Sequence, residues 1–178
     1  MCHFTTLIAP SADQKRLNDI LQAHRRVAVP THNPFLAAKL DAGDSQFLTT
    51  KGCDCGTVLA ELRPSRDAAS ESDLAKIARL RKRGWSEAKI ARSVANQEHA
   101  RDRAPVTGGT IEMWSDLIAT VLADLPAKHA GLFLHWYKGD VATEALQPTL
   151  RLARKGEPIQ GALKTLNEDE VLIFERSA

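Results

Sequence analysis

The segment from Gly131 to Gly139, GLFLHWYKG, constrains the fold more than any other part of the chain. In an extended strand, successive side chains face opposite sides of the sheet. Leucine and tryptophan side chains then line one face, while Phe133, His135 and Tyr137 line the other, so both faces are largely apolar. Such a strand needs cover on both sides. We therefore expect it at the centre of a sheet with helices packed around it.

Further strands and helices are indicated on both sides of this central strand. Extended, apolar or β-branched runs predict strands at 2–9, 46–50 and 170–175. Apolar residues at helical spacing predict helices at 11–26, 35–40, 73–83, 86–95, 110–125 and 141–152, and the segment 57–62 is a brief helix or strand.

This order of elements predicts one α/β or α+β domain over residues 1–178, because the chain is long enough for one packed core and short for two. We expect about four strands in a mixed sheet, with the central strand paired to the last one. A ferredoxin-like split βαβ layout is the expected arrangement, and the segment 73–103 is expected to form a basic helical hairpin inserted into it.

Composition and the N-terminus set aside several classes of protein. With 43% hydrophobic and 26% charged residues, the chain has the composition of a globular protein rather than a disordered or fibrous one. No apolar run approaches the roughly 20 residues needed to cross a bilayer. The N-terminus lacks the pattern of a secretory signal. We therefore expect a cytoplasmic protein without a membrane partner.

The three cysteines, Cys2, Cys53 and Cys55, form the first candidate site. Their odd number and the absence of an export signal argue against a disulfide framework. Soft thiolates favour zinc, and Cys2 or His3 would complete a site with the C-x-C loop if the start of the first strand lies near the end of the second. Parallel strands would separate them. The alternatives are cysteines packed beside a glycine turn and a redox-sensitive pairing of Cys2 with the loop.

The N-terminal sequence MCHF offers another use of Cys2. It resembles the MCG start of class II glutamine amidotransferases and of the proteins that crosslink abasic DNA, at Met1 and Cys2 only. The resemblance implies removal of Met1 and a Cys2 thiol acting as nucleophile beside its own α-amino group. His3 replaces the glycine of those families, and nothing downstream matches.

Other catalytic signatures are missing from the sequence. It has no G-x-S-x-G, H-E-x-x-H, phosphate-loop or G-x-G-x-x-G motif. His135, in the middle of the central strand, is expected to be a core histidine with one ring nitrogen satisfied by a neighbour. His32, in the loop PTHNP, pairs with no nucleophile in the sequence. The sequence therefore favours a non-enzymatic protein.

Charge is concentrated in one segment. Residues 74–103 carry nine Lys or Arg against three Asp or Glu, whereas the whole chain has a net charge of only +2, so the rest is net acidic. The stretch 78–95 resembles the first two helices of a helix-turn-helix, with Gly84 in the turn, but no recognition helix follows. The predicted partner-binding residues are Arg79, Arg81, Lys82, Arg83, Trp85, Lys89 and Arg92.

These features lead to three hypotheses for function. The chain resembles short uncharacterised bacterial proteins with an MC start and a CDCG loop before a basic helical segment, and small cytosolic domains of this kind often bind other proteins, including bacterial toxins as immunity partners. The leading hypothesis is therefore a binding protein for an acidic protein partner. A nucleic-acid-binding regulator that uses the same basic surface is the second. A small enzyme or zinc protein that uses Cys2, Cys53 and Cys55 is the third.

Overall fold

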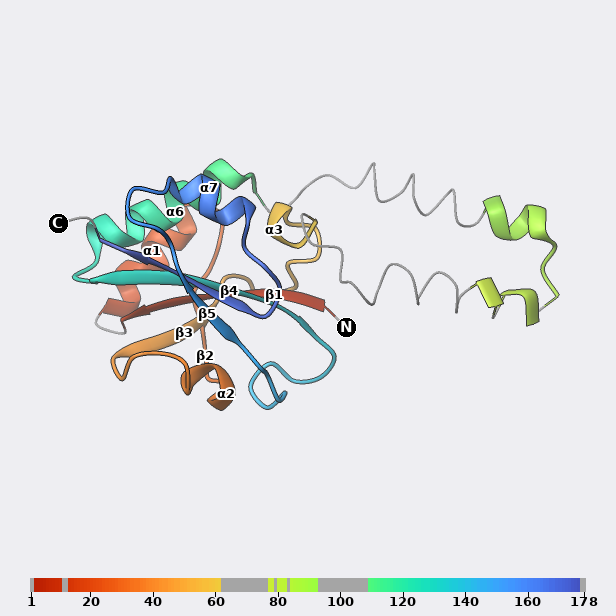
Figure 1. Ribbon diagram of the computed structural model, residues 1–178, viewed down its shortest axis with the longest axis horizontal. Helices are drawn as coiled ribbons and strands as arrows, with labels where there is room; N and C mark the ends of the chain where they lie inside the picture. The colour runs from red at the N-terminus through yellow and green to blue at the C-terminus, as the bar shows by residue number, and fades with distance from the viewer. Residues whose placement is uncertain are drawn as a thin grey trace.

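The structure is a computed structural model that describes residues 2–10, 13–61, 77–78, 80–82, 84–92 and 109–176. A six-stranded sheet with the order β2-β3-β1-β4-β6-β5 lies at its centre (Figure 1). The strands are β1 (Cys2–Pro10), β2 (Val29–Thr31), β3 (Asp44–Leu48), β4 (His129–Tyr137), β5 (Thr149–Leu152) and β6 (Glu170–Glu175). The helices are α1 (Gln14–Ala23), α2 (Pro34–Ala37), α3 (Val58–Glu61), α6 (Ile111–Asp124) and α7 (Ile159–Lys164).

Strand β4 is central, as its apolar pattern predicts. It pairs antiparallel with β1 on one side and with β6 on the other, which confirms the expected pairing with the last strand. Leu132 and Leu134 are fully buried in a larger core on one face, and Phe133 and Tyr137 are buried in a smaller core on the other. The two-sided burial explains why this strand carries so few polar side chains.

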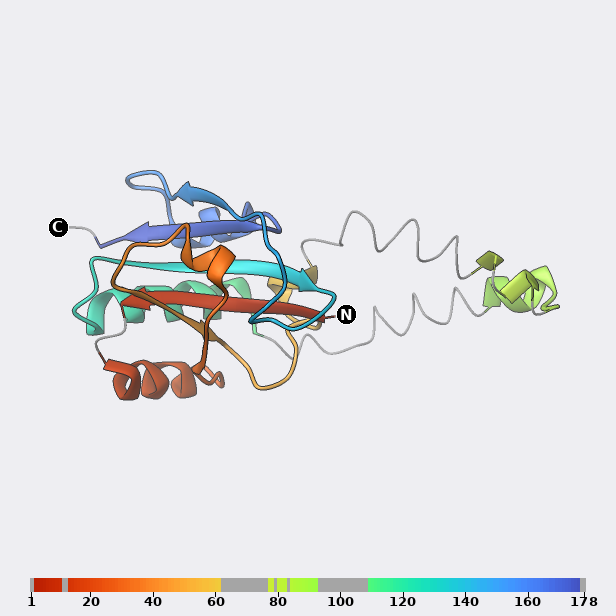
Figure 2. The same cartoon turned by 90° about the horizontal axis from the view of Figure 1, so that it is seen from below.

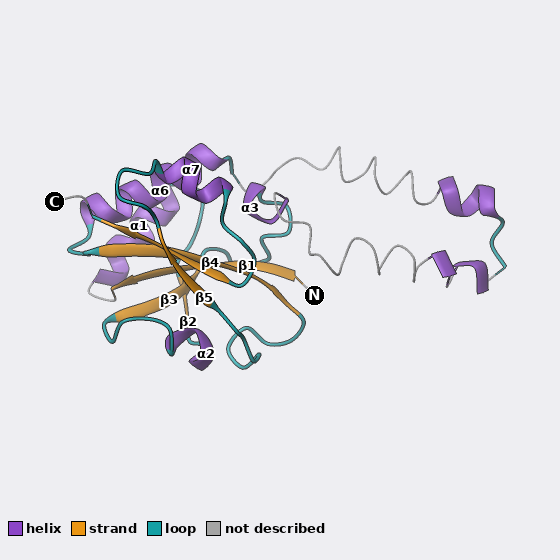
Figure 3. Ribbon diagram, viewed as in Figure 1, coloured by secondary structure: helices purple, strands orange, loops and turns teal. Residues whose placement is uncertain are grey.

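Helices cover the two faces of the sheet unequally. The larger core holds buried side chains from α1, α6 and α7, which lie on the same side of the sheet in Figures 2 and 3. Thr110 caps α6 by accepting a hydrogen bond from the Met113 amide, and the buried face of this helix includes Trp114 and Leu117. The smaller core takes Leu36 from α2 and Leu146 from the segment after β4.

The sheet has six strands rather than about four, and the expectation of a helix over 141–152 is wrong. Residues 141–144 form turns, and Thr149–Leu152 forms strand β5, which pairs in parallel with β6. Pro148 explains part of this difference, because proline lacks the amide that a helix interior requires. The β5-α7-β6 unit is a parallel crossover at the sheet edge.

The ferredoxin-like layout is not confirmed. A split βαβ unit places the first strand parallel to a neighbour, whereas both neighbours of β1, strands β3 and β4, run antiparallel to it. The part of the sheet nearest the N-terminus is therefore an antiparallel array in which the start of β1 lies at the same end as the end of β3.

The described residues 77–78, 80–82 and 84–92 include helical turns on both sides of Gly84 and lie apart from the sheet in Figures 1 and 2. The Gly84 amide donates to the Arg81 carbonyl over 2.9 Å, and the Trp85 amide donates to the Leu80 carbonyl over 3.1 Å. Gly84 has φ +77, the left-handed conformation that this helix ending requires. The rest of the predicted hairpin over 73–103 lies outside the described residues. Among those that are described, no helix has the length and apolar character needed to cross a membrane.

Candidate functional site

The antiparallel pairing of β1 with β3 brings the three cysteines together. Thr6 on β1 is opposite Leu48 at the end of β3, so the chain that leaves β3 continues along the first residues of β1. The Sγ atoms of Cys2, Cys53 and Cys55 all lie within 4.8 Å of one another. The condition for a joint site, that the start of one strand meets the end of the other, is therefore met.

The loop that carries Cys53 and Cys55 takes the place of a strand along the first half of β1, which β3 does not reach. The amides of Thr49 and Asp54 donate to the carbonyls of Thr5 and His3, over 3.2 and 2.8 Å. In the other direction, the Thr5 amide donates to the Asp54 carboxylate over 2.8 Å. The His3 amide donates to the sulfur of Cys55 over 3.2 Å. Four backbone groups of β1 are thus satisfied by one loop, which fixes where its two thiols lie.

Asp54, between the two cysteines, anchors the loop in the protein interior. Its carboxylate is 2.5 Å from the Arg26 guanidinium, and the two side chains are 0% and 7% exposed. The guanidinium in turn lies 4.6 Å from the ring centroid of Trp114 on α6. Burial raises the pKa of Asp54, and the Thr5 amide and the Arg26 charge hold part of that rise back. The loop is therefore tied to β1, to the end of α1 and to α6 at a single carboxylate.

The thiols differ in acidity although they share one site. The backbone amide of Cys55 donates to Cys53 and lowers its pKa, with help from the neighbouring thiols. Partial burial raises the pKa of Cys55 to about 11, and the adjacent sulfurs add to this rise. The fold therefore disfavours the thiolate of Cys55 unless a cation supplies positive charge beside it.

The donor set fits a thiophilic metal ion. Tetrahedral zinc has Zn–S distances of about 2.3 Å, which places its sulfur ligands roughly 3.8 Å apart. The three sulfurs here lie close enough for one ion. No further His, Cys, Asp or Glu of the described ranges completes the group. The ring of His3 is not part of it: this ring packs 4.4 Å from Trp136, and burial lowers its pKa to about 4.

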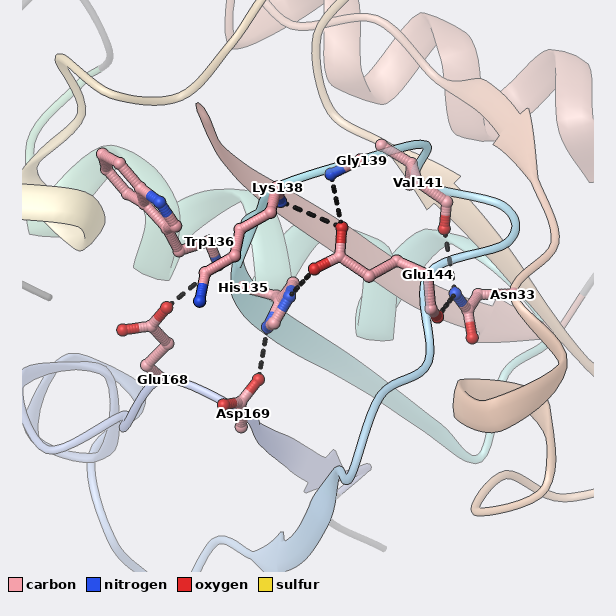
Figure 4. A network of polar contacts seen from close by, with 9 residues as sticks. All are labelled: Asn33, His135, Trp136, Lys138, Gly139, Val141, Glu144, Glu168 and Asp169. Atoms are coloured by element: carbon pink, nitrogen blue, oxygen red, sulfur yellow. Dashed lines mark hydrogen bonds and ion pairs between the residues drawn. The ribbon is translucent and has the colours of Figure 1, made fainter. Parts of the chain in front are cut away.

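A second polar cluster surrounds His135 on the opposite face of β4 (Figure 4). The Nδ1 atom contacts the carboxylate of Asp169, and Nε2 lies 3.5 Å from Glu144. Glu144 also accepts hydrogen bonds from the amides of Lys138 and Gly139, over 2.9 and 2.7 Å. The expectation of one satisfied ring nitrogen is thus wrong, since both have a carboxylate partner. The cluster fastens the segment after β4 to β4 itself and to the start of β6.

Charge determines how this cluster behaves with pH. Burial opposes protonation of the His135 ring, but the hydrogen bond and charge of Asp169, together with Glu144, raise its pKa overall. Burial alone would raise the pKa of Glu144, but the hydrogen bonds from the Gly139 amide and from His135 outweigh this effect. The pKa of Glu144 is therefore lowered. The cluster is a half-buried imidazole between two carboxylates, which together favour its protonated form.

A third group with metal-ligating side chains was not anticipated from the sequence. Asp41, Asp44 and His129 lie within 4.8 Å of one another. His129 Nε2 is 2.9 Å from Asp44, and the pair joins the first residues of β3 and β4 across the end of β1. The contact between His129 and Asp44 is explained as an ion pair or hydrogen bond without a metal ion. The group can therefore be used as a control when metal binding at the thiols is tested.

The predicted partner-binding residues are only partly described. Arg79 and Arg83 lie outside the described residues. Arg81 makes a two-point contact with Glu87 over 2.7 and 2.9 Å, so its own neighbour offsets its charge. Lys89 lies 4.2 Å from the Trp85 ring centroid, and Trp85 is half-buried beneath it. Lys82 and Arg92 are exposed.

Comparison with known proteins adds no family assignment. No protein-family model, curated protein or solved structure matches this chain. The residues themselves therefore carry the functional argument.

Replacing Asp54 tests whether it anchors the loop. Asp54→Ala leaves the Arg26 charge buried without its partner, so we expect it to lower the free energy of unfolding by about 3–5 kcal/mol. Urea unfolding followed by circular dichroism measures this change. Glu87→Ala breaks an exposed ion pair and should leave the unfolding midpoint in place. Equal effects of the two substitutions would contradict an anchoring role for Asp54.

Stability should follow the charges of the His135 cluster. Because the pKa of His135 is raised in the fold, its contribution is complete below its unfolded value of 6.5 and is lost as the pH rises through the folded value. Because the pKa of Glu144 is lowered, its contribution is complete above 4.5 and is lost as the pH falls. We expect wild-type stability to decline on both sides of this window, and His135→Gln to flatten the alkaline side. An unchanged alkaline slope in the variant would rule this out.

Proposed function

We propose that this protein binds a zinc ion through the thiolates of Cys2, Cys53 and Cys55. The convergence of three sulfurs from two separate segments carries the proposal. Zinc is the favoured ion because a site made only of thiolates suits a soft or borderline metal rather than calcium or magnesium. Three protein ligands leave one coordination position for water or another ligand, the arrangement of zinc sites that exchange ligands.

The environment of the thiols supports this proposal. A thiolate accepts hydrogen bonds, and the His3 amide already donates to the Cys55 sulfur. Such bonds around metal ligands orient them and stabilise their negative charge. The buried Asp54 holds Cys53 and Cys55 in place before any ion arrives. Folding has therefore already ordered the loop. Metal binding does not have to supply the free energy for that ordering, so the affinity is higher than for a flexible loop.

A zinc titration of the reduced chain tests the proposal. We expect binding of one ion, with release of thiol protons and an affinity that weakens as the pH falls. Each of Cys2→Ser, Cys53→Ser and Cys55→Ser should weaken binding, and Asp54→Asn, which touches no metal, should cost about 10–100-fold. At a free zinc concentration 100 times the dissociation constant, unfolding should require about 2.7 kcal/mol more. Calorimetry in buffers of different ionisation enthalpy measures affinity and proton release together.

Three outcomes would contradict zinc binding at the thiols. His129→Gln disrupts the Asp41–Asp44–His129 group but leaves every thiol intact, so loss of zinc binding in this variant alone would place the ion there. A native mass lower by two hydrogens that zinc does not change would instead support a Cys2 disulfide with the loop. Wild-type binding that survives loss of any one thiol would also exclude the three-sulfur site.

A second candidate function rests on the exposed cations near Gly84. Lys82, Lys89 and Arg92 are exposed, and the described residues place no carboxylate within ion-pair distance of them. With Arg79, Arg81 and Arg83 they would attract an acidic protein, such as a toxin, and the half-buried Trp85 would add apolar contact. A nucleic acid would be attracted by the same charges.

Charge reversal separates these partners. We expect the triple variant Lys82→Glu, Lys89→Glu and Arg92→Glu to lose the acidic partner captured by the wild-type chain, because attraction becomes repulsion. Lys39→Glu with Lys155→Glu, two exposed lysines elsewhere, is the control. Affinity for a DNA or RNA duplex that falls steeply with salt would favour the nucleic acid. Capture that is unaffected by the triple reversal would exclude binding of either an acidic protein or a nucleic acid through these cations.

A further inference from the structure

A cavity of about 440 Å³ lies beside Cys53, between the end of α1 and the loop after β3. Its charged lining residues are Arg25, Arg26 and Lys51, and all three are cationic. Thr50 and Thr57 also line it. Protein sites for small organic molecules typically have volumes of about 300–1,000 Å³, so the cavity has a suitable size.

The cavity has a positive charge that its own surroundings do not cancel. The Arg26 guanidinium is offset by Asp54, which lies beneath it. Arg25 and Lys51 are exposed, and no acidic side chain of the described residues forms an ion pair with either. Two uncompensated cations at one cavity attract an anion.

Two threonine residues of the lining have hydroxyl protons that are available to donate. The Thr50 hydroxyl oxygen accepts a hydrogen bond from the Gly52 amide over 3.1 Å. The Thr57 hydroxyl oxygen accepts one from the Ala60 amide over 3.3 Å. Because each oxygen is used as an acceptor, each hydroxyl proton is left to donate to a ligand. Oxyanions accept from several donors of this kind.

The backbone of Arg25 provides an independent observation. Helix α1 ends in a turn where the Arg25 amide donates to Gln22 and the Arg26 amide donates to Leu21, over 2.9 and 2.8 Å. Arg25 has φ +57, the left-handed conformation. Glycine is the residue that adopts this conformation without strain. An arginine at this position costs stability but directs a cation to the cavity. Strain of this kind points to a role for the side chain in binding.

We propose that this cavity binds the phosphate group of a small organic phosphate. The Arg25 guanidinium and the Lys51 ammonium neutralise the phosphate, and Thr50 and Thr57 donate to its oxygens. Arginine matches phosphate oxygens with a planar pair of donors, and lysine adds a point charge. The remaining volume accommodates the organic part of the ligand. The cavity borders the thiol site at Cys53, but none of the two cations and two threonines that would hold the phosphate supplies a metal ligand.

Titration of the metal-free, reduced chain with inorganic phosphate and with ribose 5-phosphate tests the proposal. We expect ribose 5-phosphate to bind more tightly than inorganic phosphate. Arg25→Gly should raise the urea midpoint, because it relieves the left-handed arginine, while it weakens phosphate binding about 10-fold or more through loss of a charged hydrogen bond. Lys51→Gln should weaken binding without changing the midpoint. Lys155→Gln, on an exposed loop after β5, is the control and should leave both unchanged.

Several results would overturn the proposal. Equal phosphate affinity in Arg25→Gly and the wild-type chain would remove the arginine from the site. Acetate binding as tight as phosphate binding would identify a carboxylate site instead. Absence of phosphate binding at millimolar concentration would exclude the site altogether. A failed zinc titration would bear on none of these results, since they are obtained without metal and with all thiols intact.

Discussion

The buried ion pair between Arg26 and Asp54 holds together the parts of the molecule on which function depends. Removing two charges from water is costly, and it is tolerated here because the carboxylate also accepts from the Thr5 amide and the guanidinium packs on Trp114. One contact thus joins β1, the end of α1, the cysteine loop and α6. Asp54 lies between two of the three cysteines in the sequence, and Arg26 lines the cationic cavity. Without it, the segment after β3 would lose its buried anchor, although its hydrogen bonds to Thr5 and His3 would still hold it along β1.

Sequence patterns predicted the helices and strands that are determined by their own residues. Strand β4 is recognisable because it is apolar on both faces, and α6 because its apolar stripe follows a threonine cap. The short strands β2 and β5 are not recognisable, because each contains or follows a proline and is stabilised by a distant partner strand. The helix expected over 141–152 failed for the same reason: Leu146 and Leu150 are helical in spacing, yet the backbone of Thr149–Leu152 pairs with β6.

The sequence could predict the three-cysteine site only on the condition that two strands run in opposite directions. The sequence showed which cysteines would meet if the first and third strands of the sheet ran in opposite directions, and strand direction is a property of the whole fold. The role of Asp54 was visible only as its position between two cysteines, because its partner Arg26 is 28 residues away. The partners of His135 are 9 and 34 residues away in the sequence. Its charged surroundings therefore left no local signature.

Arg25 and Arg26 are neighbours in sequence and both line the cavity, but Arg26 is also paired with the carboxylate between the cysteines. Anything that shifts the end of α1 therefore moves both. Two ligands that each prefer the same position of this helix end would strengthen each other's affinity, and thermodynamic linkage requires the effect to be equal in both directions. A single turn of backbone is in this way a short mechanical connection between the proposed anion site and the proposed metal site.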